Sequence, residues 1–164
     1  LITGMNIIDN LLLRDYKKLP FAKHSIVNRS AMRKNAEEKM QQYQVRASGK
    51  SGVDTQVRLL SGGNQQKLII ARELTDSAKL IIASQPTRGL DIGATEFVRQ
   101  QLINQRNAGK AVMLISADLE EIMSLSDRIA VLFGGKIVGV LSREEATVQK
   151  IGLLMGGISE EEEK

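Results

Sequence analysis

The sequence has no cysteine, no tryptophan and only one histidine among its 164 residues. The lack of cysteine excludes disulfides and thiolate metal sites, and it suits a reducing compartment. The histidine, His24, has no neighbours of metal-ligand type, so we expect no metal site of the chain's own. Aromatic residues make up 3% of the sequence, which leaves few rings for stacking on nucleic-acid bases. No apolar run reaches the roughly 18 residues of a membrane-spanning helix.

The composition is that of a globular domain, with 42% hydrophobic and 26% charged residues. A chain of this length can bury about 68–70% of its unfolded surface in one domain. Its formal net charge of +4 would suit nucleic acid or an anionic membrane surface. We interpret the basic residues as spread along the chain on a solvated surface. We therefore predict no nucleic-acid partner and no direct membrane insertion.

Helical periodicity dominates the sequence up to residue 75. One helix is predicted from Asn6, a second from an N-cap at Ser30, and a third from Ser61 to about Thr75. A Gly/Ser-rich loop, ASGKSGVD, separates the second helix from the third. Apolar residues mark the inner sides of the first two helices: Ile7, Ile8, Leu11, Leu12, Met32, Ala36, Met40 and Tyr43.

The pattern changes to strand, helix, strand beyond residue 76. Two short buried strands are predicted at 80–83 and 111–116, because each is an apolar run of strand length. A hairpin is predicted around the two-residue turn Gly134-Gly135. Helices are predicted at 94–109, 116–127 and 142–156. Strands alternating with helices predict an α/β fold with a mostly parallel sheet and an antiparallel edge.

The loop stretch GKS at residues 49–51 ends like a phosphate-binding P-loop, G-x-x-x-x-G-K-[ST]. The first glycine of that pattern would fall on Gln44. No apolar strand leads into the stretch, and no apolar helix follows it. We therefore interpret it as a plain loop, and no other stretch of the sequence fits the pattern.

The stretch LSGGNQQK, residues 60–67, opens the third predicted helix. Ser61 can cap the helix, and Gly62 and Gly63 allow close approach to its backbone. A helix N-terminus carries about half a positive charge, which suits a phosphate group, and Lys67 adds a full charge. The plain alternative is a capped amphipathic helix. Two glycines in the first turn cost about 1 kcal/mol each against alanine, so a binding role is favoured.

The stretch LSGGNQQK resembles the signature motif of ATP-binding-cassette (ABC) ATPases, in the variant of simple-sugar and nucleoside importers. The resemblance continues in order along nearly the whole chain. ITGMNIIDNLLL resembles the segment after the Q-loop, LIIASQPTRGLD the Walker B strand and D-loop, LISADLEEI the switch region, and DRIAVLFGGKIVG the terminal hairpin. Five segments in family order make the resemblance far more specific than one short motif.

The resemblance implies a P-loop NTPase-type α/β fold in three parts. A helical signature subdomain is expected at residues 1–75. The rear part of the ATPase core, with Walker B, D-loop and switch, is expected at 76–158, and an acidic tail at 159–164. The front half, with Walker A and the Q-loop, would lie upstream of Leu1. The chain is thus expected to be a fragment lacking Walker A.

Three catalytic positions of the family carry other residues in this sequence. The Walker B Asp and Glu positions are Ser84 and Gln85, and the switch His position is Ala117. Serine is a weak neutral partner for Mg²⁺, and glutamine cannot take a proton from water. Loss of a general base commonly costs about 10²–10⁴-fold in rate. The resemblance therefore implies a degenerate second cassette, and the fragment alone is expected to be inactive.

ABC cassettes work as head-to-tail pairs, so the resemblance implies that the signature serves a partner cassette's ATP site in trans. ATP and Mg²⁺ would be bound with the missing front half or with the partner. A transmembrane permease would dock on the helix Asn6–Leu13 and its surroundings, and would hold the chain at the cytoplasmic side of the membrane without lipid contact. The residues implied are Leu60, Ser61, Gly62, Gly63, Asn64 and Gln65 for nucleotide, and Gly89, Leu90 and Asp91 for the D-loop. Independently of the resemblance, Asp91 can cap the helix that begins near Gly93.

Several functions are consistent with the resemblance. An importer of nucleosides fits the A-x-Q-P-T-R-G-L-D form best, and simple sugars are the close alternative. A soluble ABC-type ATPase not linked to transport is a second hypothesis, although no long coiled-coil insertion is present. A module that binds no nucleotide is a third, and the Ser61-Gly62-Gly63 sequence argues against it.

Overall fold

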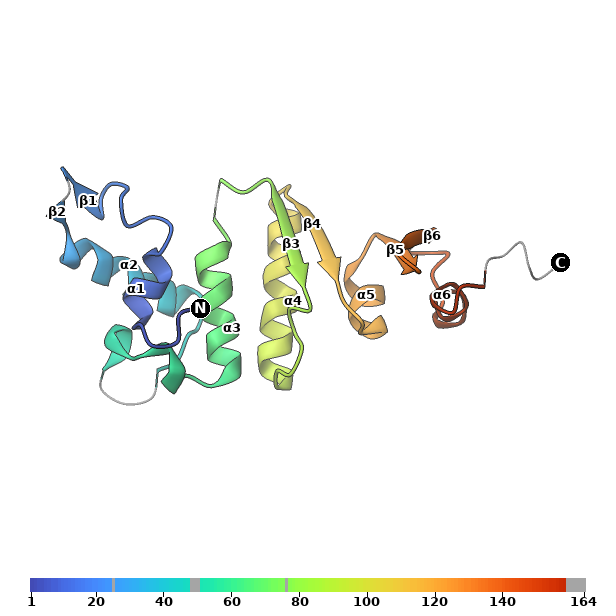
Figure 1. Ribbon diagram of the computed structural model, residues 1–164, viewed down its shortest axis with the longest axis horizontal. Helices are drawn as coiled ribbons and strands as arrows, with labels where there is room; N and C mark the ends of the chain where they lie inside the picture. The colour runs from blue at the N-terminus through green and yellow to red at the C-terminus, as the bar shows by residue number, and fades with distance from the viewer. Residues whose placement is uncertain (25, 48–50, 76, 159–164) are drawn as a thin grey trace. The chain divides into compact units, whose positions relative to one another are not determined.

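The computed structural model describes residues 1–24, 26–47, 51–75 and 77–158 (Figure 1). It divides into two compact units. Unit 1 contains residues 1–81 and 86–111, and unit 2 contains residues 82–85 and the chain from 112 onward. The predicted acidic tail and most of the GKS stretch lie outside the described residues.

Helix α1 (Ile7–Leu12) is the centre of the unit 1 core. Asn6 caps it by accepting a hydrogen bond from the Asp9 N–H at 2.8 Å. The buried Asn10 side chain bonds to the backbone N–H and carbonyl of Ile2 at 2.9 Å each. Ile7, Ile8, Asn10, Leu11 and Leu12 are all buried. These side chains are covered within the unit and do not themselves offer a docking face, while permease docking on the surroundings of this helix stays a prediction.

Helix α2 (Arg29–Gln42) begins one residue after Asn28. The side-chain oxygen of Asn28 accepts from the Ala31 N–H at 3.0 Å, so the predicted cap at Ser30 is wrong. Asn28 also donates its own N–H to the Phe21 carbonyl at 2.8 Å, which holds it outside the helix. As predicted, Met32 and Ala36 face the core.

A small antiparallel hairpin that the sequence pattern did not predict lies between α1 and α2. Its strands are β1 (Ala22–Lys23) and β2 (Ile26–Val27), which pair Ala22 with Val27 and Lys23 with Ile26. Phe21 packs against the core of unit 1 and anchors the hairpin there.

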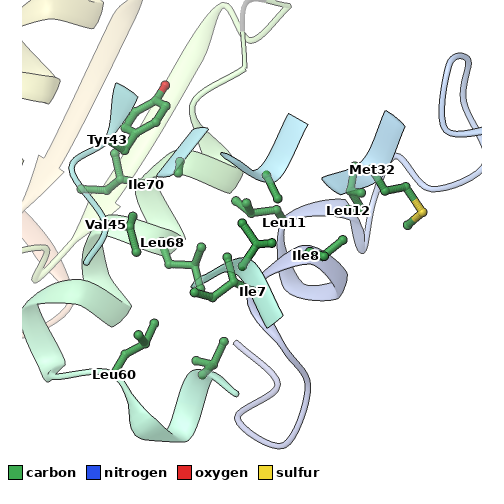
Figure 2. Packing of buried hydrophobic residues seen from close by; sticks show 14 of the residues in the cluster. Ile7, Ile8, Leu11, Leu12, Met32, Tyr43, Val45, Leu60, Leu68 and Ile70 are labelled. Atoms are coloured by element: carbon green, nitrogen blue, oxygen red, sulfur yellow. The ribbon is translucent and has the colours of Figure 1, made fainter. Parts of the chain in front are cut away.

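Helix α3 (Gly62–Glu73) follows two short 3₁₀ turns, η1 (Gly52–Asp54) and η2 (Val57–Leu59). Leu68 and Ala71 are fully buried on its inner side, which packs on α1. Figure 2 shows side chains from α1, α2 and α3 meeting in this core. The core cluster contains Ile7, Ile8, Leu11, Leu12, Met32, Ala36, Tyr43, Val45, Val53, Val57, Leu60, Leu68, Ile70, Ala71 and Val98.

Strand β3 (Leu80–Ser84) pairs with β4 (Ala111–Ile115), and their arrows point the same way in Figure 1. Helix α4 (Ile92–Asn107) connects them and packs on α3. Both strands were predicted to be buried, and this is wrong for alternate residues. Leu80 and Ile82 are 56% and 61% exposed, because no layer of the described chain covers that face. Strand type, but not burial, was therefore predicted correctly.

Unit 2 contains the predicted hairpin, formed by β5 (Arg128–Phe133) and β6 (Lys136–Ser142). Gly134 and Gly135 have φ of 55° and 78°, which suits the two-residue turn. Helix α5 (Leu119–Leu125) precedes the hairpin, and α6 (Val148–Met155) follows and packs on β5. At the corner before α6, the Ser142 N–H donates to Glu145 and lowers the pKa of that carboxyl.

The α/β class is confirmed, and the strands of the described residues form three two-stranded sheets. The hairpin β5–β6 forms its own sheet in the described residues, separate from β3–β4. Within the described ranges, no helix combines the length and apolar character needed to cross a bilayer.

Candidate functional site

The N-terminus of α3 in unit 1 carries the first group of candidate residues. Ser61 is the N-cap, with an extended backbone (φ −61°, ψ 157°). Its Oγ accepts hydrogen bonds from the Asn64 N–H at 3.4 Å and from the Asn64 side-chain amide at 2.9 Å. Ser61 and Gly62 are exposed, whereas Leu60 is buried in the core. The predicted helix start is therefore confirmed. Its first residues are exposed to solvent, and Leu60, just before them, is fixed in the core.

The side-chain amides of the first turn bond to the chain itself. The Asn64 oxygen accepts from the Arg46 N–H at 2.7 Å, and the Gln65 amide donates to the Leu60 carbonyl at 3.1 Å. These bonds brace the residues on both sides of Ser61. Backbone N–H groups at the exposed start of a helix are suited to an anion.

Lys67, expected to add charge at this helix end, lies elsewhere. Its Nζ is 4.8 Å from the centre of the Phe97 ring on α4, and it approaches the Gln44 carbonyl at 3.5 Å. This cation–π contact joins α3 to α4. Lys67 therefore contributes to packing between the two helices.

The residues predicted for the D-loop lie in the turn before α4. Gly89 has φ 74°, a conformation that favours glycine, and the Leu90 N–H donates to the Thr87 carbonyl at 3.2 Å. Asp91 is the N-cap of α4 and accepts from the Ala94 N–H at 2.8 Å. The predicted cap at Asp91 is thus confirmed.

The structure brings the α3 and α4 N-termini together at Gly63, which sequence reasoning missed. A Cβ at Gly63 would be 3.0 Å from the Ala94 Cβ and 3.3 Å from Asp91 Oδ2. A Cβ at Gly62 would have no neighbour within 4 Å. The two adjacent glycines therefore differ in role: Gly63 permits helix contact, and Gly62 leaves the helix end open.

This difference predicts that two matched substitutions differ in stability. Gly62→Ala is expected to be neutral or to raise the free energy of unfolding by up to about 1 kcal/mol, because alanine favours helix. Gly63→Ala gains the same helix propensity but crowds the buried Ala94, and overpacking of this kind costs about 1–3 kcal/mol, so it is expected to be the less stable of the two. Urea unfolding of both variants measures the difference. Equal stabilities would contradict the close approach of the helices.

A second group of candidate residues lies at the strand ends in unit 2. Ser84 ends β3, and the next residue, Gln85, donates its N–H to the Ile115 carbonyl on β4 at 2.7 Å. Ala117 lies two residues beyond that carbonyl. Gln85 has φ 48°, an uncommon conformation for a residue other than glycine. The adjacent strands thus bring Gln85 to Ile115, two residues before Ala117 in the chain.

These strand ends offer no charged group for catalysis. Ser84, Gln85 and Ala117 are neutral, and none can act as a carboxylate base or as an imidazole. Among the described residues, no cluster of three or more His, Asp or Glu side chains could hold a metal ion. The geometry therefore provides a strand edge without an acid–base pair.

Known proteins resemble this chain closely. The family model described as ABC transporter matches residues 4–88. The guanosine import ATP-binding protein NupO of Bacillus subtilis is 48% identical over 162 residues, which cover 99% of this chain and 31% of that protein. The nucleoside import ATP-binding protein NupA of Lactococcus lactis is 44% identical, with 96% and 30% covered. The chain thus spans about a third of the length of these relatives.

Solved structures give the same result for the fold. The dimeric post-hydrolysis state of the ATP-binding cassette MJ0796, bound to ADP and Pi, has a TM-score of 0.68 and 26% identity, covering 87% of this chain and 59% of that one. A nucleotide-free cassette from an ABC transporter has a TM-score of 0.72 at 18% identity, covering 97% and 65%. By sequence match and by fold, this chain belongs to the ABC transporter family, as part of an ATP-binding cassette.

Proposed function

We propose that the chain is part of the ATP-binding subunit of an importer, and that its α3 N-terminus completes the ATP site of a partner cassette. The observation that carries this proposal is the contrast between the two candidate sites. Ser61 and Gly62 are exposed, and the space beside Gly62 is open, whereas the strand ends at Ser84 and Gln85 lack both carboxylates. This chain is thus suited to binding a phosphate at the α3 N-terminus, and its strand ends are unsuited to hydrolysing ATP.

The α3 N-terminus fits the terminal phosphate of ATP. The helix supplies backbone N–H groups and the Ser61 hydroxyl, and the open space at Gly62 lets a phosphate oxygen come close to them. The role of this chain would be to orient the phosphate held by the partner. Asp91 lies beside the same turn through its contact at Gly63, so the D-loop and the signature would face the partner together.

The strand ends do not fit Mg²⁺ or an attacking water. Mg²⁺ is bound through carboxylates and phosphates, and Ser84 and Gln85 carry no charge. We infer that this cassette's own site does not hydrolyse ATP, and that Mg²⁺ for the reaction is bound in the partner. The chain by itself is then expected to show no ATP turnover.

Nucleosides are the substrate class we favour, and simple sugars are the alternative. Two of the similar proteins bear names of guanosine or nucleoside import, and others bear names of glucose, xylose or ribose import at 35–40% identity. Substrate would pass through a transmembrane permease with which the subunit assembles. That assembly would place the chain at the cytoplasmic face of the membrane.

Placing carboxylates at the strand ends tests the proposal that ATP is hydrolysed in the partner cassette's site and not in this one. In the complete transporter, Ser84→Asp combined with Gln85→Glu is expected to leave ATP turnover within about 2-fold of the original, since Ala117 still lacks an imidazole. Replacing the Walker B glutamate of the partner cassette with glutamine is expected to lower turnover by about 10²-fold or more. Initial rates of phosphate release measure both effects. A large gain from the first change would show that only Ser84 and Gln85 limit this site.

A further inference from the structure

A group of basic residues surrounds one hairpin, in a chain whose other basic residues are spread along the sequence. Residues 14–29 contain five Lys or Arg residues and one acidic residue, so their net charge is +4. The segment around β1 and β2 is therefore locally basic. Figure 1 shows these strands at the edge of unit 1, apart from α3.

Two of these cations have no carboxylate partner within the described residues. Arg14 pairs with Glu73 at 2.6 Å, Lys18 with Asp15 at 2.6 Å, and Arg29 with Asp9 at 3.2 Å. Lys17 and Lys23 form no ion pair with the described carboxylates, and both are exposed. The Nζ of Lys17 lies 5.6 Å from the centre of the Tyr16 ring.

Large apolar side chains are exposed beside these lysines. Leu19 is 73% exposed and Ile26 is 75% exposed, while Phe21 packs inward and fixes the segment to the core. Exposed apolar groups of this size mark a contact surface when they gather in one place. Lys23 and Ile26 are cross-strand neighbours and share one face of the hairpin. We define the hairpin patch by five residues: Tyr16, Lys17, Leu19, Lys23 and Ile26.

We propose that the hairpin patch contacts an anionic lipid surface. Lysines around exposed aliphatic side chains suit lipid, where apolar area and attraction to anionic headgroups act together. Tyrosine is also enriched at the boundary between headgroups and acyl chains. A protein partner is less suited, since lysine is depleted in protein interfaces. The proposal revises the expectation of no lipid contact, and it does not depend on the role in ATP hydrolysis.

Vesicle flotation tests the proposal with the full chain. The protein is expected to float with vesicles of phosphatidylcholine mixed with phosphatidylglycerol, and much less with phosphatidylcholine alone. Raising the salt concentration is expected to weaken the binding. Failure to bind the mixed vesicles better than the neutral ones would overturn the proposal and favour an acidic protein surface as the partner.

Two pairs of variants separate the patch from general properties of the chain. Lys17→Glu with Lys23→Glu is expected to lower partitioning by at least about 30-fold, from about 1 kcal/mol per lysine. Lys79→Glu with Lys136→Glu makes the same charge change at exposed sites elsewhere, and is expected to lower it by less than about 3-fold. Leu19→Ser with Ile26→Ser is expected to lower it by about 10-fold, and Ile92→Ser, at another exposed residue, by less than about 2-fold. Equal losses within either pair would overturn the proposal.

Discussion

Ser61→Arg in the complete transporter is expected to reduce ATP turnover by about 10²–10³-fold, toward background. The arginine side chain would fill the open space at the α3 N-terminus, where a Cβ at Gly62 would have no neighbour within 4 Å. A phosphate held by the partner would then lose the hydroxyl and the nearby backbone N–H groups. The measurement is the initial rate of phosphate release at saturating ATP.

Ser51→Arg is the matched control for this experiment. Ser51 also precedes a helical turn in unit 1 and is exposed, but its side chain makes no capping hydrogen bond. It is expected to leave turnover within about 2-fold of the original, as for a surface substitution away from any special feature. Ser61→Ala adds a second comparison, because it removes the cap, at about 1 kcal/mol, without blocking the helix end. Unchanged turnover with Ser61→Arg would refute the proposal that this signature completes the productive site.

Leu68→Ala is expected to lower the free energy of unfolding by about 2–5 kcal/mol. Leu68 is fully buried where α3 packs on α1, so the shorter side chain leaves a cavity among Ile7 and its neighbours. Such a loss is a large part of the 5–15 kcal/mol that is typical of a whole domain. Urea unfolding followed by circular dichroism measures the effect.

Leu59→Ala makes the same chemical change on the surface of unit 1. Leu59 is 64% exposed, so its truncation is expected to alter the free energy of unfolding by less than about 0.5 kcal/mol. A similar loss of unfolding free energy in both variants would show that the packing of Leu68 between α3 and α1 does not stabilise the core. If Leu68→Ala lowers ATP turnover more than its instability explains, the packing of α3 also positions Ser61.

Helix starts were predictable where one capping residue stands alone before an apolar repeat. Ser61 and Asp91 meet this condition, and each caps the helix expected of it. The start of α2 was not predictable, because Asn28 and Ser30 are both capping types two residues apart. The hydrogen bond from Asn28 to Phe21 decides between them, and it depends on a hairpin that the sequence pattern did not reveal.

Burial was harder to predict than secondary structure. An apolar run identifies β3, but nothing local says whether a layer covers both faces of the strand, and Ile82 is 61% exposed. The apolar residues of α1 fall on one side of the helix, opposite Asp9 and Asn10, which is the pattern of a helix packed on a core. Such a helix belongs in a core, and Leu11 and Leu12 lie there.

The candidate site was predictable residue by residue but not as an arrangement. Two consecutive glycines indicate close approach to a backbone, yet they do not identify the partner. The partner of Gly63 is the start of α4, nearly thirty residues away along the chain. Contacts at that separation depend on how helices pack, which local pattern does not specify.

The hydrogen bonds at Ser61 also set which chemical groups this helix end can select. A serine hydroxyl has one proton to donate and two lone pairs. Asn64 donates to Ser61 Oγ from both its backbone and its side chain, so these lone pairs are occupied. The hydroxyl can then act toward a ligand only as a hydrogen-bond donor, so an oxyanion, which only accepts, is a better match than an ammonium group, which only donates. The hydrogen bonds between Asn64 and Ser61 thus already favour anionic ligands at this helix end in the absence of a partner cassette.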